Sequence, residues 1–211
     1  MNTERKGILI VVSGFSGSGK GTIMKRLLEE HSAQYALSIS ATTRSPREGE
    51  QHGKEYFFVS EAEFERMIQQ EELIEYARYV NHYYGTPKRY VEEQLNLGKD
   101  VILEIEIQGA LKIKEKYPKT LMLFVTPPSA DELKTRLVGR GTEDAGTIQS
   151  RLRRAVEEAE GIEAYDYLVV NDELEACVAE VHEIIKSEHY RIARNDHMIH
   201  KIKQELMSFV Q

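Results

Sequence analysis

The chain has 211 residues, of which 41% are hydrophobic and 30% are charged, with a formal net charge of −7. This length and composition are those of one globular domain with insertions. The negative charge argues against a general nucleic-acid-binding surface, and the longest apolar runs are far too short to cross a membrane. Cys177 is the single cysteine, which excludes an internal disulfide. Together with the absence of a signal-peptide pattern, it favours a reducing, cytoplasmic setting.

A phosphate-binding pattern lies near the start of the chain. The apolar run 8–12 is followed by a glycine-rich loop and then by a segment with helical spacing, 22–30. The loop reads Gly14-Phe15-Ser16-Gly17-Ser18-Gly19-Lys20. Its spacing, G-x-x-x-x-G-K, lets backbone N–H groups surround an anion while the lysine adds a positive charge. The N-terminus of the following helix would face the same anion, so residues 14–22 are predicted to bind nucleotide phosphates.

One position departs from this pattern. The residue after Lys20 is usually Ser or Thr, whose hydroxyl reaches Mg²⁺, but here Gly21 precedes Thr22. We therefore expect no direct metal ligand from this position, and Mg²⁺ to be held through water or by groups elsewhere. Lys-Gly-Thr is also similar to the loop of adenylate kinases, so the loop alone does not identify a phosphate acceptor.

The next part of the chain predicts short strands rather than crossover units. Alternating runs occupy 35–40, 55–59 and 73–79, and a helix over 61–70 has Ser60 as its cap and Glu63 in the capping box. Strands this close together predict a small antiparallel excursion.

The remainder alternates buried strands with helices. Strands are expected at 101–105, 121–125 and 167–170, and helices at 86–97, 111–117, 130–138, 148–160 and 173–186. The alternation predicts an α/β fold, with a P-loop NTPase-like parallel sheet and helices on both faces. We assign the core to 1–38, 90–127 and 162–187, and a helical tail to 188–211. The insertions at 39–89 and 128–161 would surround the ligand crevice, the second of them as a lid.

A second anion site is indicated within the first insertion. Arg44 and Arg47 lie three residues apart around Pro46, with Tyr56 beyond. Two guanidinium groups and a phenol can bind a phosphate, although a solvated polar loop would have the same composition.

Several longer motifs resemble guanylate kinase. They lie at 40–50, 53–59, 73–77, 83–86, 102–109 and 139–143, and the resemblance covers about 7–187. The family transfers a phosphoryl group from ATP, with Mg²⁺, to GMP. The resemblance therefore implies ATP and GMP as ligands, and it leaves open whether deoxy-GMP is accepted and whether the chain is a homo-oligomer.

The resemblance assigns the first insertion to GMP. The implied GMP-binding residues are Ser40, Arg44, Arg47, Glu50, Tyr56, Glu75, Tyr84, Thr86 and Glu104. The arginines and tyrosines match the phosphate contacts, with Glu50 bracing the arginine pair. Glu75 matches a guanine contact, because one carboxylate can accept both N1–H and the 2-amino group.

Two acidic residues near the predicted strand 101–105 have an open role. Glu104 and Glu106 alternate, so we expect both on one face. They would contact GMP or the waters around Mg²⁺, or would form an ion pair with Lys20 or an arginine. Most members of the family have Asp at these positions.

The resemblance assigns the second insertion to ATP. Residues 134–154 include six basic and two acidic residues, a net charge of +4. Arg140 and Arg151 match charge clamps that close over the phosphates, and Arg136 and Asn171 match the adenine side. We expect Lys20, Arg44, Arg140 and Arg151 to be catalytic, without a general base.

The C-terminal tail has an apolar stripe that includes Ile199, Ile202 and Leu206. This stripe predicts that the tail packs on the core or on another subunit.

Two other functions remain alternatives, a different nucleoside monophosphate kinase and a catalytically inactive guanylate-kinase-like binding module. A regulatory GTPase is disfavoured because no Asn-Lys-x-Asp motif occurs.

Overall fold

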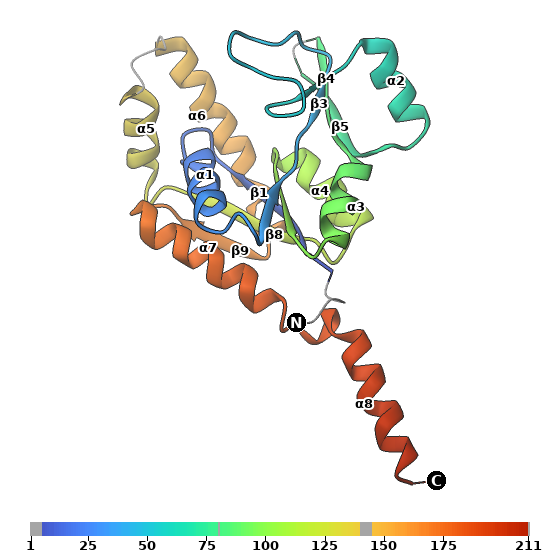
Figure 1. The fold of residues 1–211 in the computed structure, drawn as a ribbon. Helices are drawn as coiled ribbons and strands as arrows, with labels where there is room; N and C mark the ends of the chain where they lie inside the picture. The colour runs from blue at the N-terminus through green and yellow to red at the C-terminus, as the bar shows by residue number, and fades with distance from the viewer. Residues whose placement is uncertain (1–5, 80, 140–144, 211) are drawn as a thin grey trace.

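The computed structural model describes residues 6–79, 81–139 and 145–210 (Figure 1). Its centre is a five-stranded sheet in the order β2-β7-β1-β8-β9, in which every neighbouring pair is parallel. The strands are β1 Leu9–Gly14, β2 Tyr35–Leu37, β7 Asp100–Glu104, β8 Leu121–Thr126 and β9 Tyr167–Val170. The α/β core with a parallel sheet is therefore confirmed.

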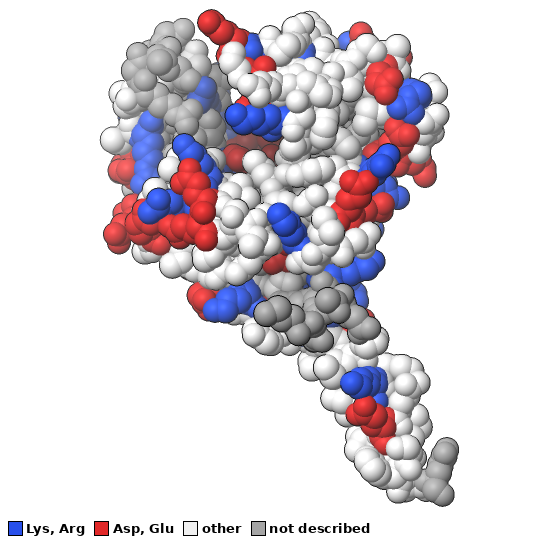
Figure 2. All heavy atoms as spheres, viewed as in Figure 1, with Lys and Arg blue, Asp and Glu red and all other residues white. Residues whose placement is uncertain are grey.

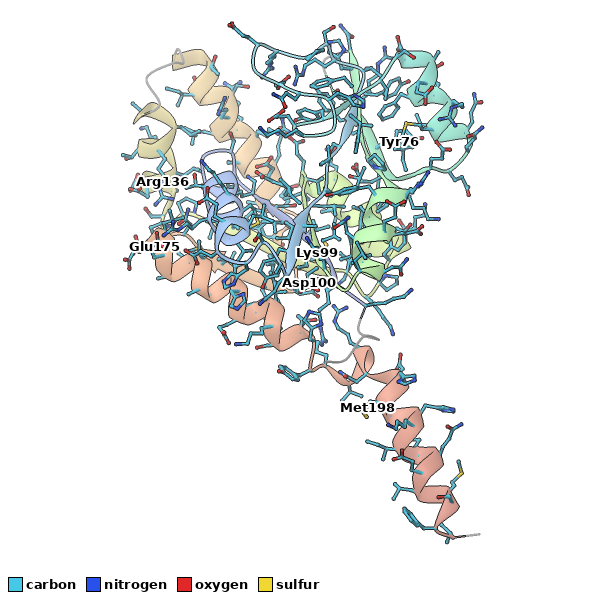
Figure 3. The ribbon with its side chains drawn as sticks, viewed as in Figure 1. Tyr76, Lys99, Asp100, Arg136, Glu175 and Met198 are labelled. Carbon is cyan, nitrogen blue, oxygen red and sulfur yellow. The ribbon has the colours of Figure 1, made fainter. Side chains whose placement is uncertain are left out.

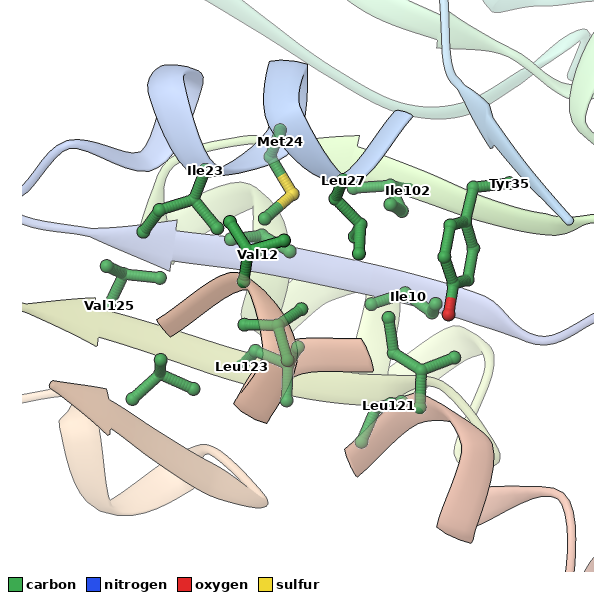
Figure 4. Packing of buried hydrophobic residues seen from close by; sticks show 14 of the residues in the cluster. Ile10, Val12, Ile23, Met24, Leu27, Tyr35, Ile102, Leu121, Leu123 and Val125 are labelled. Atoms are coloured by element: carbon green, nitrogen blue, oxygen red, sulfur yellow. The ribbon is translucent and has the colours of Figure 1, made fainter. Parts of the chain in front are cut away.

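Helices cover both faces of this sheet. Helices α1 (Lys20–Glu30) and α7 (Leu174–Glu188) pack on one face, and α3 (Lys88–Asn96) and α4 (Ile107–Lys116) pack on the other. Alternate residues of β1 serve the two layers: Ile10 and Val12 pack with α1 and α7, while Val11 packs with α3 and α4. Figure 4 shows the first layer, where Ile23, Met24 and Leu27 of α1 lie over β1 and β8.

A smaller sheet follows the order β4-β3-β6-β5, with strands β3 Ala41–Thr42, β4 Phe57–Phe58, β5 Leu73–Tyr79 and β6 His82–Pro87. Helix α2 (Glu61–Gln69) packs on it through Phe64, whose ring stacks on Tyr83 at 5.1 Å between centroids. The Ser60 cap is present, since its hydroxyl accepts from the Glu63 amide at 3.1 Å.

The structure corrects two details of this region. The run beginning at Tyr35 forms β2 at the edge of the main sheet, where it pairs with β7, and it lies within the part of the chain assigned to the core. Strand β3 pairs parallel with β4, so the excursion is not purely antiparallel. Thr86 and Pro87 belong to β6, and the helix that follows begins at Lys88.

Two helices form the proposed lid, α5 (Ala130–Gly139) and α6 (Ala145–Ala159), and a short 3₁₀ turn, η1 (Ile162–Ala164), follows them. Leu133 and Leu137 of α5 pack against Ala155 of α6 and against Phe15 of the phosphate loop. In Figure 1 these helices lie on one side of the phosphate loop and the small sheet lies on the other.

The tail contains a 3₁₀ turn, η2 (Ile192–Arg194), and helix α8 (Asp196–Ser208), which runs away from the body (Figure 1). None of the residues of α8 is buried, and its first turn touches the core through Asp196, which pairs with Lys119 at 3.0 Å. The first part of the tail packs on the core, since His189 contacts Asp100 at 2.9 Å and Arg194 donates to the Lys119 carbonyl at 2.7 Å. The apolar stripe of α8 is not buried against the core, and its packing on another subunit stays a prediction. Within the described residues, no helix combines the length and the apolar character that a membrane span requires.

Candidate functional site

The phosphate loop connects β1 to α1 and is shaped by two glycines. Gly14 lies so close to β8 that an added Cβ would stand 2.1 Å from the Val125 carbonyl oxygen. Gly19, immediately before α1, has φ +89°, a left-handed conformation that is unfavourable for residues with a Cβ atom. Lys20 folds back over the loop, and its Nζ donates to the Gly14 carbonyl at 2.6 Å and to the Phe15 carbonyl at 3.1 Å.

Asn171 supports this loop from behind. The residue follows β9, is buried, and donates from Nδ2 to the Ser18 carbonyl at 2.7 Å. The Gly19 Cα lies against the same amide, since an added Cβ would approach Nδ2 to 2.3 Å. The contacts thus show Asn171 as a support of the loop, and its role on the adenine side stays a prediction.

A cleft of about 810 Å³ opens next to the loop. Its wall combines the phosphate loop, the end of β7, the first insertion and α6. The site residues that line it are Gly14, Ser16, Lys20, Ser40, Tyr56, Glu104 and Arg151. Figure 2 shows the hollow between the lid side and the small-sheet side, with basic and acidic side chains around it. One cavity thus joins segments that are more than 100 residues apart in the sequence.

Arg44 is held on the small-sheet side by Glu50. Its guanidinium donates to Glu50 Oε1 at 2.8 Å, and the two side chains are only 13% and 18% exposed. This hydrogen bond raises the pKa of Arg44 and lowers the pKa of Glu50, so both stay charged. The Arg47 amide donates to the second oxygen of Glu50 at 2.7 Å. Glu50 therefore fixes the guanidinium of Arg44 and the backbone of Arg47, while the Arg47 side chain is exposed.

Two tyrosines stand beside Arg44. Its guanidinium lies 5.4 Å from the centre of the Tyr56 ring, and the rings of Tyr56 and Tyr84 meet edge to face at 6.1 Å. Burial raises the pKa of Tyr56, which keeps its hydroxyl protonated as a donor. Arg44, Tyr56 and Tyr84 can therefore present three donors to one phosphate group.

Glu75 lies at a half-buried position on β5. Its Oε1 accepts from the Thr86 hydroxyl at 2.8 Å, and burial raises the pKa of its carboxyl. Gly109 of α4 leaves room beside it, since an added Cβ would stand 3.4 Å from Glu75 Oε2. The carboxylate thus keeps acceptor capacity in a confined space, which suits paired N–H donors.

Glu104 and Glu106 do not share a strand face, contrary to the prediction. Strand β7 ends at Glu104, and Glu106 is already the residue that caps α4. Glu104 faces the phosphate loop, with both oxygens 3.9 Å from where a Gly21 Cβ would stand. Burial raises the pKa of Glu104, and Lys20 opposes that rise. Glu106 forms an ion pair with Arg154 of α6, so one of the two expected ion-pair alternatives is present.

The lid arginines take different positions. Arg151 reaches the phosphate loop, where Nη1 donates to the Ser16 hydroxyl at 3.1 Å. Arg136 instead pairs with Glu132 on its own helix at 2.7 Å and does not line the cleft. Figure 3 shows Arg136 on α5, on the far side of the molecule from Tyr76 of the small sheet. Arg140 lies outside the described residues.

Among the cleft-lining residues that sequence reasoning missed are Arg154 and Glu158. Both lie on α6 and face the cleft together with Arg151. Arg154 lies three residues after Arg151, and Glu158 lies four residues after Arg154. This spacing is the signal that could have identified them, because residues spaced in this way share one helix face.

Comparison with known proteins identifies the family. The family model described as guanylate kinase matches residues 6–188. A guanylate kinase of Oceanobacillus iheyensis is 50% identical over 97% of this chain and 99% of its own length. One of Caldanaerobacter subterraneus subsp. tengcongensis is 48% identical over the same shares. The crystal structure of guanylate kinase from Anaplasma phagocytophilum superposes with a TM-score of 0.71 at 31% identity and covers 92% of both chains. The chain belongs to the guanylate kinase family.

Proposed function

We propose that the chain transfers the γ-phosphoryl group of ATP to GMP, which gives ADP and GDP. The observation that carries this proposal is the pairing of two anion-binding groups on one cleft. Lys20 and the phosphate loop lie on one side, and Tyr56, next to Arg44, lies on the other. Two phosphate sites that face each other suit a direct transfer between two nucleotides.

The proposed roles follow from where charge develops. Residues 14–22 hold the phosphates of ATP, with Lys20 on the transferred group, and Arg151 and Arg140 stabilise the charge that develops on it. Arg44, Arg47, Tyr56 and Tyr84 hold the phosphate of GMP, whose oxygen attacks. No general base is needed, because that phosphate is already ionised near neutral pH.

The base of the acceptor is selected by Glu75. Guanine presents N1–H and the 2-amino group side by side, and both can donate to one carboxylate. Adenine has no donors at these positions and would leave the half-buried carboxylate without a partner on the base, which is a costly mismatch. Thr86 orients the carboxylate, and Ser40 lies on the same side of the cleft.

Magnesium is proposed to bind together with ATP, where it neutralises the donor phosphates. The residue types around the loop suit this role, although Gly21 offers no hydroxyl. Glu104 supplies a carboxylate that faces Gly21 and lies close to Lys20. We assign Glu104 to the ion or to its bound water, since carboxylates are preferred partners of hydrated Mg²⁺.

The alternatives account less well for the site. An inactive binding module has no need of a lysine-bearing phosphate loop with a lid arginine 3.1 Å from its Ser16 hydroxyl. A kinase for AMP or UMP would not require a half-buried carboxylate beside Thr86. Cys177 is buried and its pKa is raised to about 11 by burial, so its thiol is unreactive. A lone protected thiol fits the cytoplasm, where we place the enzyme.

The proposal is tested by measuring ADP release with ATP and Mg²⁺ against GMP, deoxy-GMP, AMP, UMP and CMP in parallel. GMP should be the preferred acceptor, and chelation of Mg²⁺ should abolish the reaction. Deoxy-GMP should also react, because none of the proposed contacts uses the 2′-hydroxyl. Equal or faster reaction with AMP would refute the assignment of Glu75.

A further inference from the structure

Helix α6 presents a continuous face to the cleft. Thr147, Ser150, Arg151, Arg154 and Glu158 all line it, at the spacing of three and four residues that places side chains on one side of a helix. From this face, Arg151 contacts the phosphate loop through the Ser16 hydroxyl. The position of α6 therefore decides whether Arg151 reaches the donor phosphates.

Arg154 joins this helix face to the core. Its Nη2 contacts Glu106 Oε2 at the start of α4, and its Nε donates to Glu158 Oε1 at 3.2 Å, one helical turn further along α6. Glu158 is 16% exposed at its side chain, and burial raises its pKa. The guanidinium thus lies between two carboxylates, one from the lid and one from the core.

The start of α4, where Glu106 lies, is fixed on two sides. Gly161, the last residue of the proposed lid, packs against Ile107, since an added Cβ would lie 2.9 Å from Ile107 Cγ2. One turn along α4, Gly109 lies against Glu75. A side chain of α6 that is tied to Glu106 is therefore tied to a rigid part of the core.

We propose that Arg154 is a positioning residue for phosphoryl transfer. Its bridge between Glu106 and Glu158 holds the inner face of α6 against the core and so keeps Arg151 at the phosphate loop. Arg154 acts through Arg151 and does not itself contact the transferred group. This inference rests on the proposed function, in which Arg151 stabilises charge on the ATP phosphates.

The size of the effect follows from the exposure of the bridge. The side chains of Arg154 and Glu106 are 37% and 64% exposed, so their ion pair is partly screened by water. A pair of this kind changes the equilibrium between the held and released positions of α6 by at most about fivefold. Arg154→Met should accordingly lower kcat by roughly two- to fivefold.

The matched control is Arg153→Met. Arg153 is the neighbouring arginine on α6, and it is exposed and does not line the cleft. Both variants lose one positive charge and keep a long apolar side chain. Arg153→Met should have the kcat of the unaltered enzyme. Arg154→Lys keeps the charge but not the planar double contact, so its kcat should lie between those of Arg153→Met and Arg154→Met.

The decisive experiment is a double-mutant cycle with Arg151→Met, read out as kcat and as KM for GMP and ATP. If Arg154 acts through Arg151, adding Arg154→Met to Arg151→Met should cause no further loss of kcat, and KM for GMP should stay unchanged throughout. Additive losses would show a direct contact with substrate and would overturn the proposal. A kcat of Arg154→Met equal to that of Arg153→Met would also overturn the proposal. Failure of the unaltered enzyme to phosphorylate GMP would instead refute the proposed function.

Discussion

Replacing Glu75 by Gln tests how the base is recognised with almost no change in shape. The carboxylate is half-buried on β5 and is already oriented by the Thr86 hydroxyl at 2.8 Å. Gln keeps one oxygen acceptor but presents an NH₂ group where the second oxygen was. One donor of guanine would then face another donor inside a confined space.

The expected loss can be estimated from hydrogen-bond energies. A hydrogen bond to a charged group contributes about 1.5–3 kcal/mol, so losing one should lower kcat/KM for GMP by roughly 10- to 150-fold. KM for ATP should change by less than about twofold, because Glu75 lies on the acceptor side. The preference for GMP over IMP, which has no 2-amino group, should also shrink.

A coupled assay of ADP release can measure both substrates in turn, each against a saturating concentration of the other. The control is Glu72→Gln, three residues earlier, where the carboxylate is 42% exposed and pairs with Arg66. It should leave both KM values unchanged. Equal losses for GMP and ATP in Glu75→Gln would refute the reasoning.

Three further predictions concern the loop and the half-buried carboxyl. Lys20→Met should lower kcat by about 100-fold or more while circular dichroism shows an intact fold, and near-normal turnover would remove its assigned role. Gly19→Ala should lower the free energy of unfolding by about 2–3 kcal/mol, because alanine disfavours the left-handed φ and its Cβ would displace the Asn171 amide. Tm should fall by roughly 5–10 °C, and an unchanged Tm would contradict the close contact. Burial raises the pKa of the Glu75 carboxyl, so the folded state disfavours the ionised form. The resulting loss of stability is absent at low pH, where the carboxyl is protonated, and grows as pH rises through the raised pKa. Glu75→Gln should therefore raise Tm at pH 8 more than at pH 4.5, and the opposite trend would refute this sign.

Local patterns predicted the features whose partners are close in sequence. The phosphate loop depends on glycines and a lysine within seven residues, and the cap of α2 depends on Ser60 and Glu63, so both could be identified directly. The pairing of Glu50 with Arg44 is also close in sequence, but it was expected from the family resemblance and not from a local pattern. The alternation of buried strands with helices was enough to predict the parallel core, because such strands read as continuous apolar runs.

Features set by distant partners could not be predicted in this way. Strand β3 is two residues long, and its parallel pairing with β4 and antiparallel pairing with β6 could not be seen in the sequence. The alternation of Glu104 and Glu106 predicted that both lie on one strand face. Helix α4 begins earlier than predicted, at the buried Ile107, so Glu106 occupies the N-cap position of a helix instead. The apolar stripe of α8 predicted an amphipathic helix correctly, but a stripe does not say which surface covers it.

The central claim is that ATP and GMP bind face to face in one cleft, with their phosphates between Lys20 and Arg44. A bisubstrate compound in which a pentaphosphate joins adenosine to guanosine tests this most directly through inhibition kinetics. The account predicts inhibition that is competitive against both ATP and GMP, with an affinity well above that of either nucleotide, because one molecule fills both sites. Competition with only one of the two substrates would contradict it.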